Sequence, residues 1–264
     1  MNKISYHNHN ISYQITGSGL PLVFLHGFGE NSKMWEDYTP QFSGYRVITI
    51  DLPGAGSSDF FNASIARMAK IVNAVLLEER IEKCVMIGHS MGGYVTLAFA
   101  KLYEQKLLGY CLFHSQPNAD SEEKKAGRDK AISFVKTHGA GPYLKGLIPK
   151  LFSTQFKEHN PQIINKMIDW VKDMSPNAVI GQLVAMRDRP DNQNVLRNAK
   201  VPVCFIIGEE DVAVPTENSL NQTHLPSIAD INILPDVGHQ GMFEARDETV
   251  VILRKFIAFC QALP

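Results

Sequence analysis

The sequence lacks long apolar runs, an excess of charge of either sign, and cysteine-rich segments. Nowhere in its 264 residues do 18 uncharged apolar residues follow one another, and residues 1–10 contain no apolar segment typical of a secretory signal. We therefore expect a cytoplasmic protein that neither crosses nor binds a membrane. Lys and Arg number 26 and Asp and Glu 27, so the net charge is −1. Without a basic run, nucleic acid is not expected as a partner.

Cysteines are few and lie far apart in the chain, at Cys84, Cys111, Cys204 and Cys260. Their spacing matches neither a zinc-binding motif nor the framework of a small disulfide-stapled domain. Three of them lie inside apolar runs, which predicts buried thiols in a reducing compartment. We therefore expect neither a metal site nor disulfides.

The sequence does contain a repeated alternation of short apolar runs with amphipathic stretches. Its 44% apolar and 20% charged residues are typical of a globular protein. The alternation predicts strand–helix–strand units around a mainly parallel sheet. Buried strands are predicted over residues 22–25, 47–50, 84–87, 108–113, 203–207 and 231–234, after an antiparallel hairpin over residues 5–15. Helices are predicted over residues 64–80, 91–103 and 249–263.

Residues 115–195 interrupt this alternation. They contain no strand-like run, and their charged helical stretches are separated by glycine and proline. We expect a helical insertion over one end of the sheet, which leaves residues 1–114 and 196–264 as one core domain. The charges within residues 122–125 and 187–189 mix both signs and are interpreted as solvated surface.

The strongest chemical signal is the segment GHSMGG at residues 88–93, which follows an apolar run and begins a helical pattern. In that context a G-x-S-x-G match is typical of a nucleophile elbow, a tight turn that presents a serine hydroxyl at the tip of a strand. Gly88 and Gly92 supply the small residues that such a turn needs. The alternative is a glycine-rich turn in which Ser90 only caps the helix, because the motif alone is weakly specific.

A serine needs a base to act as a nucleophile at neutral pH, and the base needs an acid to orient it, in the chain order Ser, Asp, His for this kind of turn. Asp211 and His239 each follow a predicted strand, so both are expected at the sheet edge that carries Ser90. The order and the positions favour these two residues. In one alternative, Asp211 caps a helix and Glu209 or Glu210 is the orienting acid. In the other, His239 has only a structural role.

Hydrolysis also needs N–H donors for the oxyanion of a tetrahedral intermediate. Met91, directly after the serine, offers one amide. The second is expected from Phe28 in the segment HGFG at residues 26–29, since the glycines on both sides let its amide turn toward the serine. We interpret His26 as a structural residue that braces this loop.

These motifs resemble the α/β-hydrolase fold superfamily, in its branch of lidded serine esterases. So do three further segments: DLPGAGSS at residues 51–58, GEEDVAVP at 208–215 and GH at 238–239. The resemblance covers the expected core and hardly extends to the insertion. It implies an eight-stranded, mainly parallel sheet flanked by helices, with a helical cap after the sixth strand. It also implies Ser90 as nucleophile, His239 as base, Asp211 as acid, and no cofactor.

The predicted function is hydrolysis of a small or medium carboxylic ester through an acyl-enzyme on Ser90, a carboxylesterase-like activity. His114, Val212 and Met242 are expected to line the substrate pocket. The resemblance leaves two alternatives open: a hydrolase-like small-molecule receptor with slow or single turnover, and a non-ester reaction such as that of a C–C hydrolase or a lyase. Ser90 argues against the dehalogenases and epoxide hydrolases, which carry Asp at that turn. The expected partner is a small-molecule ester, and the expected assembly a monomer or homodimer.

Overall fold

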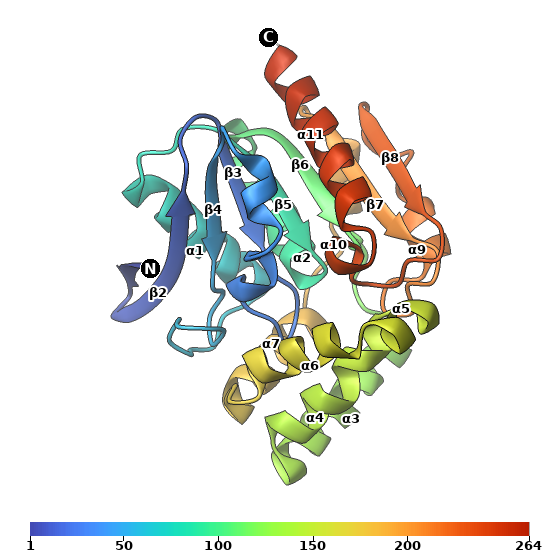
Figure 1. Cartoon of the computed structure of the whole chain (residues 1–264). Coiled ribbons are helices and arrows are strands. Elements are labelled where there is room, and N and C mark those ends of the chain that lie inside the picture. Colours follow the sequence, from blue (N-terminus) through green and yellow to red (C-terminus); the bar gives the residue numbers. More distant parts are fainter. Residues whose placement is uncertain (264) are drawn as a thin grey trace.

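The computed structural model describes residues 1–263 and contains an eight-stranded sheet between layers of helices (Figure 1). The strand order is β1-β2-β4-β3-β5-β6-β7-β8. β2 pairs antiparallel with β1 and β4, and all other neighbours are parallel, which confirms the mainly parallel sheet and its leading hairpin. The strands are β1 (Asn2–Tyr6), β2 (His9–Thr16), β3 (Pro21–Leu25), β4 (Arg46–Ile50), β5 (Cys84–His89), β6 (Leu107–Phe113), β7 (Val203–Gly208) and β8 (Ala229–Leu234).

Apolar cores lie on both faces of the sheet. α1 (Ile65–Glu78) and α2 (Met91–Tyr103) cover one face, and α11 (Arg246–Ala262) covers the other (Figure 1). Side chains of the central strands divide between the two cores in strict alternation, as β3 shows: Val23 belongs to the first core and Phe24 to the second. Because both faces are covered, these strands appear in the sequence as continuous apolar runs.

The helical insertion lies between β6 and β7 and contains no strand. Its helices are α3 (Glu122–His138), α4 (Ala140–Leu147), α5 (Thr154–His159), α6 (Pro161–Val171), α7 (Pro176–Arg187) and α8 (Gln193–Arg197), with a 3-10 turn at Ile148–Leu151. Figure 1 shows α3 to α7 gathered at the end of the sheet toward which the parallel strands run. The insertion therefore lies over the edge where the loops with the candidate residues begin.

Short helices complete the core domain. They are α9 (Thr216–Leu220), α10 (Gly241–Glu244) and the 3-10 turns Ser32–Trp35, Thr39–Phe42 and Glu104–Lys106. Within residues 1–263 no helix has the length and the apolar character that crossing a bilayer requires.

Several hydrogen bonds attach the insertion to core loops, and three of them lie close to candidate residues. Each of these three joins a loop at the carboxyl edge of the sheet to a helix or turn of the insertion: Gly29 N–H to Gln182 Oε1 at 3.1 Å, Asn31 Nδ2 to the Trp170 carbonyl at 3.0 Å, and His239 N–H to the Leu151 carbonyl at 2.7 Å. The insertion is therefore held against two of the loops on which candidate residues lie.

Two expectations about individual elements need correction. The last helix begins at Arg246, three residues before the predicted start. The strand predicted over residues 231–234 is not buried on both faces, because Ile231 and Ile233 are 46% and 43% exposed. β8 is the edge strand of the sheet, and helices cover only one of its faces.

Asp51 provides a test of the loops that follow β4. Its buried carboxylate accepts N–H groups of Ser32 at 2.8 Å and Ser57 at 2.9 Å, so Asp51→Ala leaves the buried Ser32 amide, and the Ser57 amide of a partly buried bond, without an acceptor. We expect a loss of about 2–4 kcal/mol in the free energy of unfolding, measured by urea denaturation. The control is Asp37→Ala, which removes an exposed ion pair with Lys166 and should cost less than about 1 kcal/mol. Equal denaturation midpoints for the two variants would contradict this role of Asp51.

Candidate active site

Ser90 occupies a strained turn between β5 and α2. Its backbone has φ 51° and ψ −114°, a conformation that costs a non-glycine residue about 1–3 kcal/mol and that its surroundings must hold in place. The Ser90 amide donates to the Phe113 carbonyl at 3.0 Å. The turn also requires small neighbours, because a Cβ at Gly88 would collide with the Gly92 carbonyl, and one at Gly92 with the Leu25 carbonyl. The segment thus has the strand, tight turn and helix that its motif predicted.

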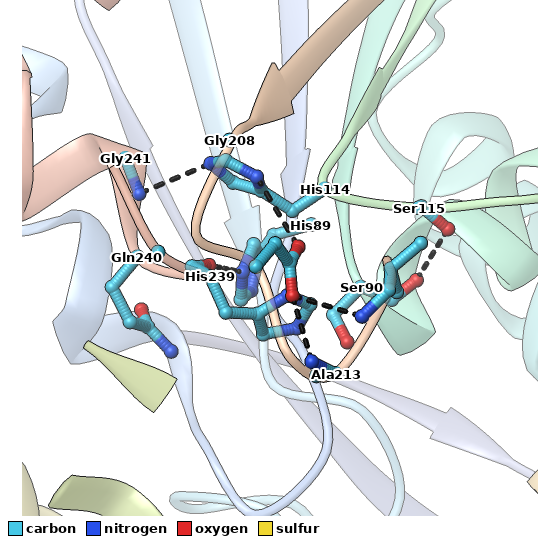
Figure 2. A network of polar contacts seen from close by, with 12 residues as sticks. His89, Ser90, His114, Ser115, Gly208, Ala213, His239, Gln240 and Gly241 are labelled. Atoms are coloured by element: carbon cyan, nitrogen blue, oxygen red, sulfur yellow. Dashed lines mark hydrogen bonds and ion pairs between the residues drawn. The ribbon is translucent and has the colours of Figure 1, made fainter. Parts of the chain in front are cut away.

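Asp211 and His239 come from the loops after β7 and β8 and meet beside this turn, where Figure 2 shows His239 close to Ser90. Asp211 Oδ2 lies 2.7 Å from His239 Nδ1. Its Oδ1 accepts the N–H groups of Ala213 at 2.9 Å and Val214 at 2.8 Å. Asp211 therefore caps its own loop and orients the His239 ring at the same time.

The electrostatics of this pair favour an ionised Asp211 and a basic His239. Burial alone would raise the pKa of Asp211, but the charge and hydrogen bond of His239 and the nearby His114 ring hold it well below its ordinary range. Burial likewise lowers the pKa of His239, yet the Asp211 carboxylate outweighs it and raises that pKa above its ordinary value. The alternative acids Glu209 and Glu210 are both exposed and make no such pair.

His114 also faces Asp211, with its Nδ1 3.5 Å from Oδ2. The Gly241 amide donates to His114 Nε2 at 3.1 Å, so a neutral ring carries its proton on Nδ1. Burial is the main cause that lowers the pKa of His114 to about 4, which keeps the ring neutral at physiological pH. Asp211 thus faces a proton-bearing nitrogen on each of two histidines.

Ser90 and His239 line the same cavity, whose volume is about 320 Å³. Phe28 also contributes to the wall, from the loop after β3. Most of the remaining lining is apolar and comes from the insertion, including Tyr143, Leu147, Leu151, Leu183 and Met186. The insertion therefore provides the apolar wall opposite the serine.

The three residues expected to line the pocket do not reach this cavity. Val212 is 72% exposed, Met242 is buried in the core beneath α11, and His114 lies behind Asp211. The expectation was wrong because a place at a strand end does not determine where a side chain points. His114 has φ 50°, in the left-handed region, a change of backbone direction that the sequence does not reveal.

Phe28 lies in the loop after β3 and lines the cavity of Ser90, and Met91 directly follows Ser90 in the chain. Met91 is the first residue of α2, and neither amide donates to a protein acceptor within residues 1–263. His26 holds the loop of Phe28, since its Nε2 accepts the Leu52 N–H at 2.9 Å and its Nδ1 lies 2.8 Å from the Gly27 carbonyl. The loop is therefore braced as expected for His26.

A second buried pair, Glu30 and His89, was not found from the sequence. His89 Nδ1 lies 3.0 Å from Glu30 Oε2, and Nε2 lies 2.9 Å from the His239 carbonyl. Both ring nitrogens thus lie within hydrogen-bond distance of oxygen acceptors. Glu30 also accepts the Gly27 N–H at 2.7 Å and the Gln240 side-chain amide at 2.8 Å. Burial opposes the charge of Glu30, but His89 lowers its pKa to about 2.

A group of side chains that could act as metal ligands lies next to Ser90. Within residues 1–263, His114, Asp211 and His239 form the one group of three ligand side chains whose donor atoms lie within 4.8 Å of one another. The two histidine nitrogens that face Asp211 are placed as hydrogen-bond donors, so they have no lone pair to offer a cation there. The arrangement is suited to hydrogen bonding between Asp211 and the two histidines.

Comparisons of sequence and of structure both relate this chain to hydrolases. The profile of the alpha/beta hydrolase family matches residues 22–252. The chain is 26% identical to a thermophilic esterase from Thermogutta terrifontis, whose solved structure superposes with a TM-score of 0.92 over 98% of both chains.

Curated relatives include enzymes with different substrates. The chain is 26% identical over 212 residues to the pimeloyl-[acyl-carrier protein] methyl ester esterase of Wigglesworthia glossinidia brevipalpis, covering 78% of this chain and 80% of that protein. It is also 26% identical to a 2-hydroxy-6-oxononadienedioate/2-hydroxy-6-oxononatrienedioate hydrolase of Paraburkholderia phymatum, covering 94% of this chain and 90% of that protein.

The Glu30–His89 pair predicts a large effect on stability. Glu30→Ala removes the common acceptor of the Gly27 amide, His89 and Gln240, and should cost about 3–5 kcal/mol in the free energy of unfolding at pH 7. Glu30→Gln keeps an oxygen and should cost less. The control is Glu36→Ala at an exposed position, expected within about 0.5 kcal/mol of wild type by urea denaturation.

The pH dependence of this contribution has a definite sign. The folded-state pKa of Glu30, about 2, lies below the ordinary 4.5, so the stability that its charge contributes is present above pH 4.5 and is lost as the pH falls toward 2. The difference between wild type and Glu30→Gln should therefore shrink over that interval. A difference that is independent of pH would contradict the buried ion pair.

Proposed function

Because this chain belongs to the alpha/beta hydrolase family, we propose that it is a serine hydrolase that cleaves a small or medium carboxylic ester through an acyl-enzyme on Ser90. The observation that carries this proposal is the shared cavity of Ser90 and His239, with Asp211 bound to the far nitrogen of the His239 ring. The similarity to two esterases supports the choice of an ester bond.

In the first half of the reaction, His239 Nε2 takes the proton of the Ser90 hydroxyl while the serine oxygen attacks the ester carbonyl. The Phe28 and Met91 amides donate to the resulting oxyanion, and each such donor contributes about 10²–10³-fold to the rate. His239 then passes its proton to the alcohol, which leaves. The raised pKa of His239 suits it to hold that proton between the two steps.

In the second half, His239 removes a proton from water, and the resulting nucleophile attacks the acyl-enzyme. The carboxylic acid leaves and Ser90 regains its hydroxyl. Asp211 keeps the proton on Nδ1 throughout, so that Nε2 faces the substrate. His114, with its neutral ring against Asp211, helps to position that carboxylate without touching the cavity.

Residues 115–195 act in this proposal as a cap that closes the cavity over the core domain of residues 1–114 and 196–264. The apolar residues of the cap that line the cavity exclude water and contact the acyl chain. The similarity to the 2-hydroxy-6-oxononadienedioate/2-hydroxy-6-oxononatrienedioate hydrolase supports a second candidate, in which the same three residues hydrolyse a C–C bond next to a carbonyl group.

Replacement of the nucleophile tests the proposal directly. For Ser90→Ala we expect kcat for a short p-nitrophenyl ester to fall by at least about 10³-fold, with the fold retained by circular dichroism. Ser133→Ala, at an exposed position on α3, should keep the wild-type rate. Comparable turnover by the Ser90 and Ser133 variants would exclude Ser90 as the nucleophile. A single burst of product from wild type, without turnover, would favour a receptor.

The pH profile tests the role of the Asp211–His239 pair. His239 accepts a proton only when neutral, and its pKa is raised, so activity should fall with decreasing pH through a pKa above the ordinary 6.5. The Asp211→Asn substitution removes the negative charge that raises the pKa of His239. The acid limb of kcat/KM should move to lower pH, and the rate should fall by about 10⁴-fold. An acid limb at the same pH in both proteins would argue against His239 as the base.

A further inference from the structure

Helix α3 places positive charge on the wall of the cavity beside Ser90. Lys124 and Arg128, one helical turn apart, both line it. Building on the proposed ester hydrolysis, we propose that Lys124 binds a carboxylate at the far end of the acyl group, so that the substrate is a monoester of a dicarboxylic acid. The interpretation of residues 122–125 as solvated surface is therefore wrong for Lys124, which is half-buried and faces the cavity.

The carboxylate of Asp120 cannot neutralise the positive charge of this wall, because two arginines share that carboxylate. Asp120 Oδ1 accepts from Arg189 Nη1 at 2.6 Å, and Oδ2 accepts from Arg128 Nε. The Asp120 and Arg189 side chains are fully buried, and the Arg189 guanidinium lies over the ring of Tyr94, another cavity residue, with Cζ 3.9 Å from its centre. One carboxylate between two guanidinium groups leaves one positive charge in excess before Lys124 adds its own.

Lys124 is the cation of this group without a partner. Its neighbour Lys125 pairs with Glu122 at 2.7 Å, whereas no acidic side chain within residues 1–263 forms an ion pair with Lys124 Nζ. Burial is the largest cause that lowers the pKa of Lys124, since the ammonium has lost part of its hydration. An anion delivered by a ligand would replace that lost hydration and balance the charge.

The other cavity residues fit the rest of such a substrate. Glu30 is the carboxylate of the lining, and it is already occupied by the Gly27 amide, His89 and Gln240. The remaining wall is mainly apolar and can contact methylene groups: Phe28, Tyr143, Leu147, Leu183 and Met186. A flexible diacid monoester can thus place its carbonyl at Ser90, its methylenes on this wall and its carboxylate at Lys124.

Matched substrates and matched lysine variants test the proposal by kinetics. We compare kcat/KM for mono-p-nitrophenyl glutarate, which is anionic, and p-nitrophenyl hexanoate, which is neutral and of similar length. Lys124→Met should lower the ratio of anionic to neutral kcat/KM about tenfold, because a charged hydrogen bond is lost while the apolar stem is kept. Lys125→Met, one residue along the same helix, is the control and should leave the ratio unchanged.

A binding measurement separates this proposal from that of ester hydrolysis. Glutarate is titrated calorimetrically into Ser90→Ala protein carrying Lys124, Lys124→Met or Lys125→Met, so no turnover is needed. We expect about tenfold weaker binding with Lys124→Met alone and weaker binding of glutarate as salt is added. Equal affinity in all three proteins, or no binding in any, would overturn the anion site. Loss of ester turnover with intact, Lys124-dependent binding would instead overturn only the proposed reaction.

Discussion

The buried carboxylate of Glu30 is the contact on which the arrangement of the active-site loops depends. It joins the loop after β3 through the Gly27 amide, the turn of the serine through His89, and the loop after β8 through Gln240. His89 extends the connection to the carbonyl of His239. Three loops that are far apart in the sequence are thus bound to one charge. An ion pair of this kind is favourable only when all its hydrogen bonds are made, so its loops must adopt their positions together.

Much of the architecture could be predicted, because it follows from local patterns. All parallel strands except the edge strand β8 are mainly apolar runs, and the order Ser90, Asp211, His239 along the chain predicted these residues at one sheet edge. The pairing of Asp211 with His239 at 2.7 Å is as expected from that order. The pocket residues could not be predicted in the same way, since side-chain direction depends on backbone geometry in the loops, as the left-handed φ of His114 illustrates.

The partners of the charged residues could not be predicted from the sequence either. Glu30 is the one Asp, Glu, Lys or Arg residue between Lys3 and Lys33, a signal of a special role, but nothing nearby in the sequence identifies His89 as its partner. Lys124 and Lys125 are chemically identical neighbours, yet one lines the cavity and the other pairs with Glu122. The way α3 packs determines which side chain faces the cavity, and its contact with α7 joins residues about fifty positions apart in the chain.

The bond from the His239 amide to the Leu151 carbonyl couples the insertion to the loop that carries the imidazole. A displacement of the 3-10 turn Ile148–Leu151 away from the core would break this bond and remove a restraint on that loop. The position of the insertion and the orientation of the imidazole are therefore linked through one backbone hydrogen bond.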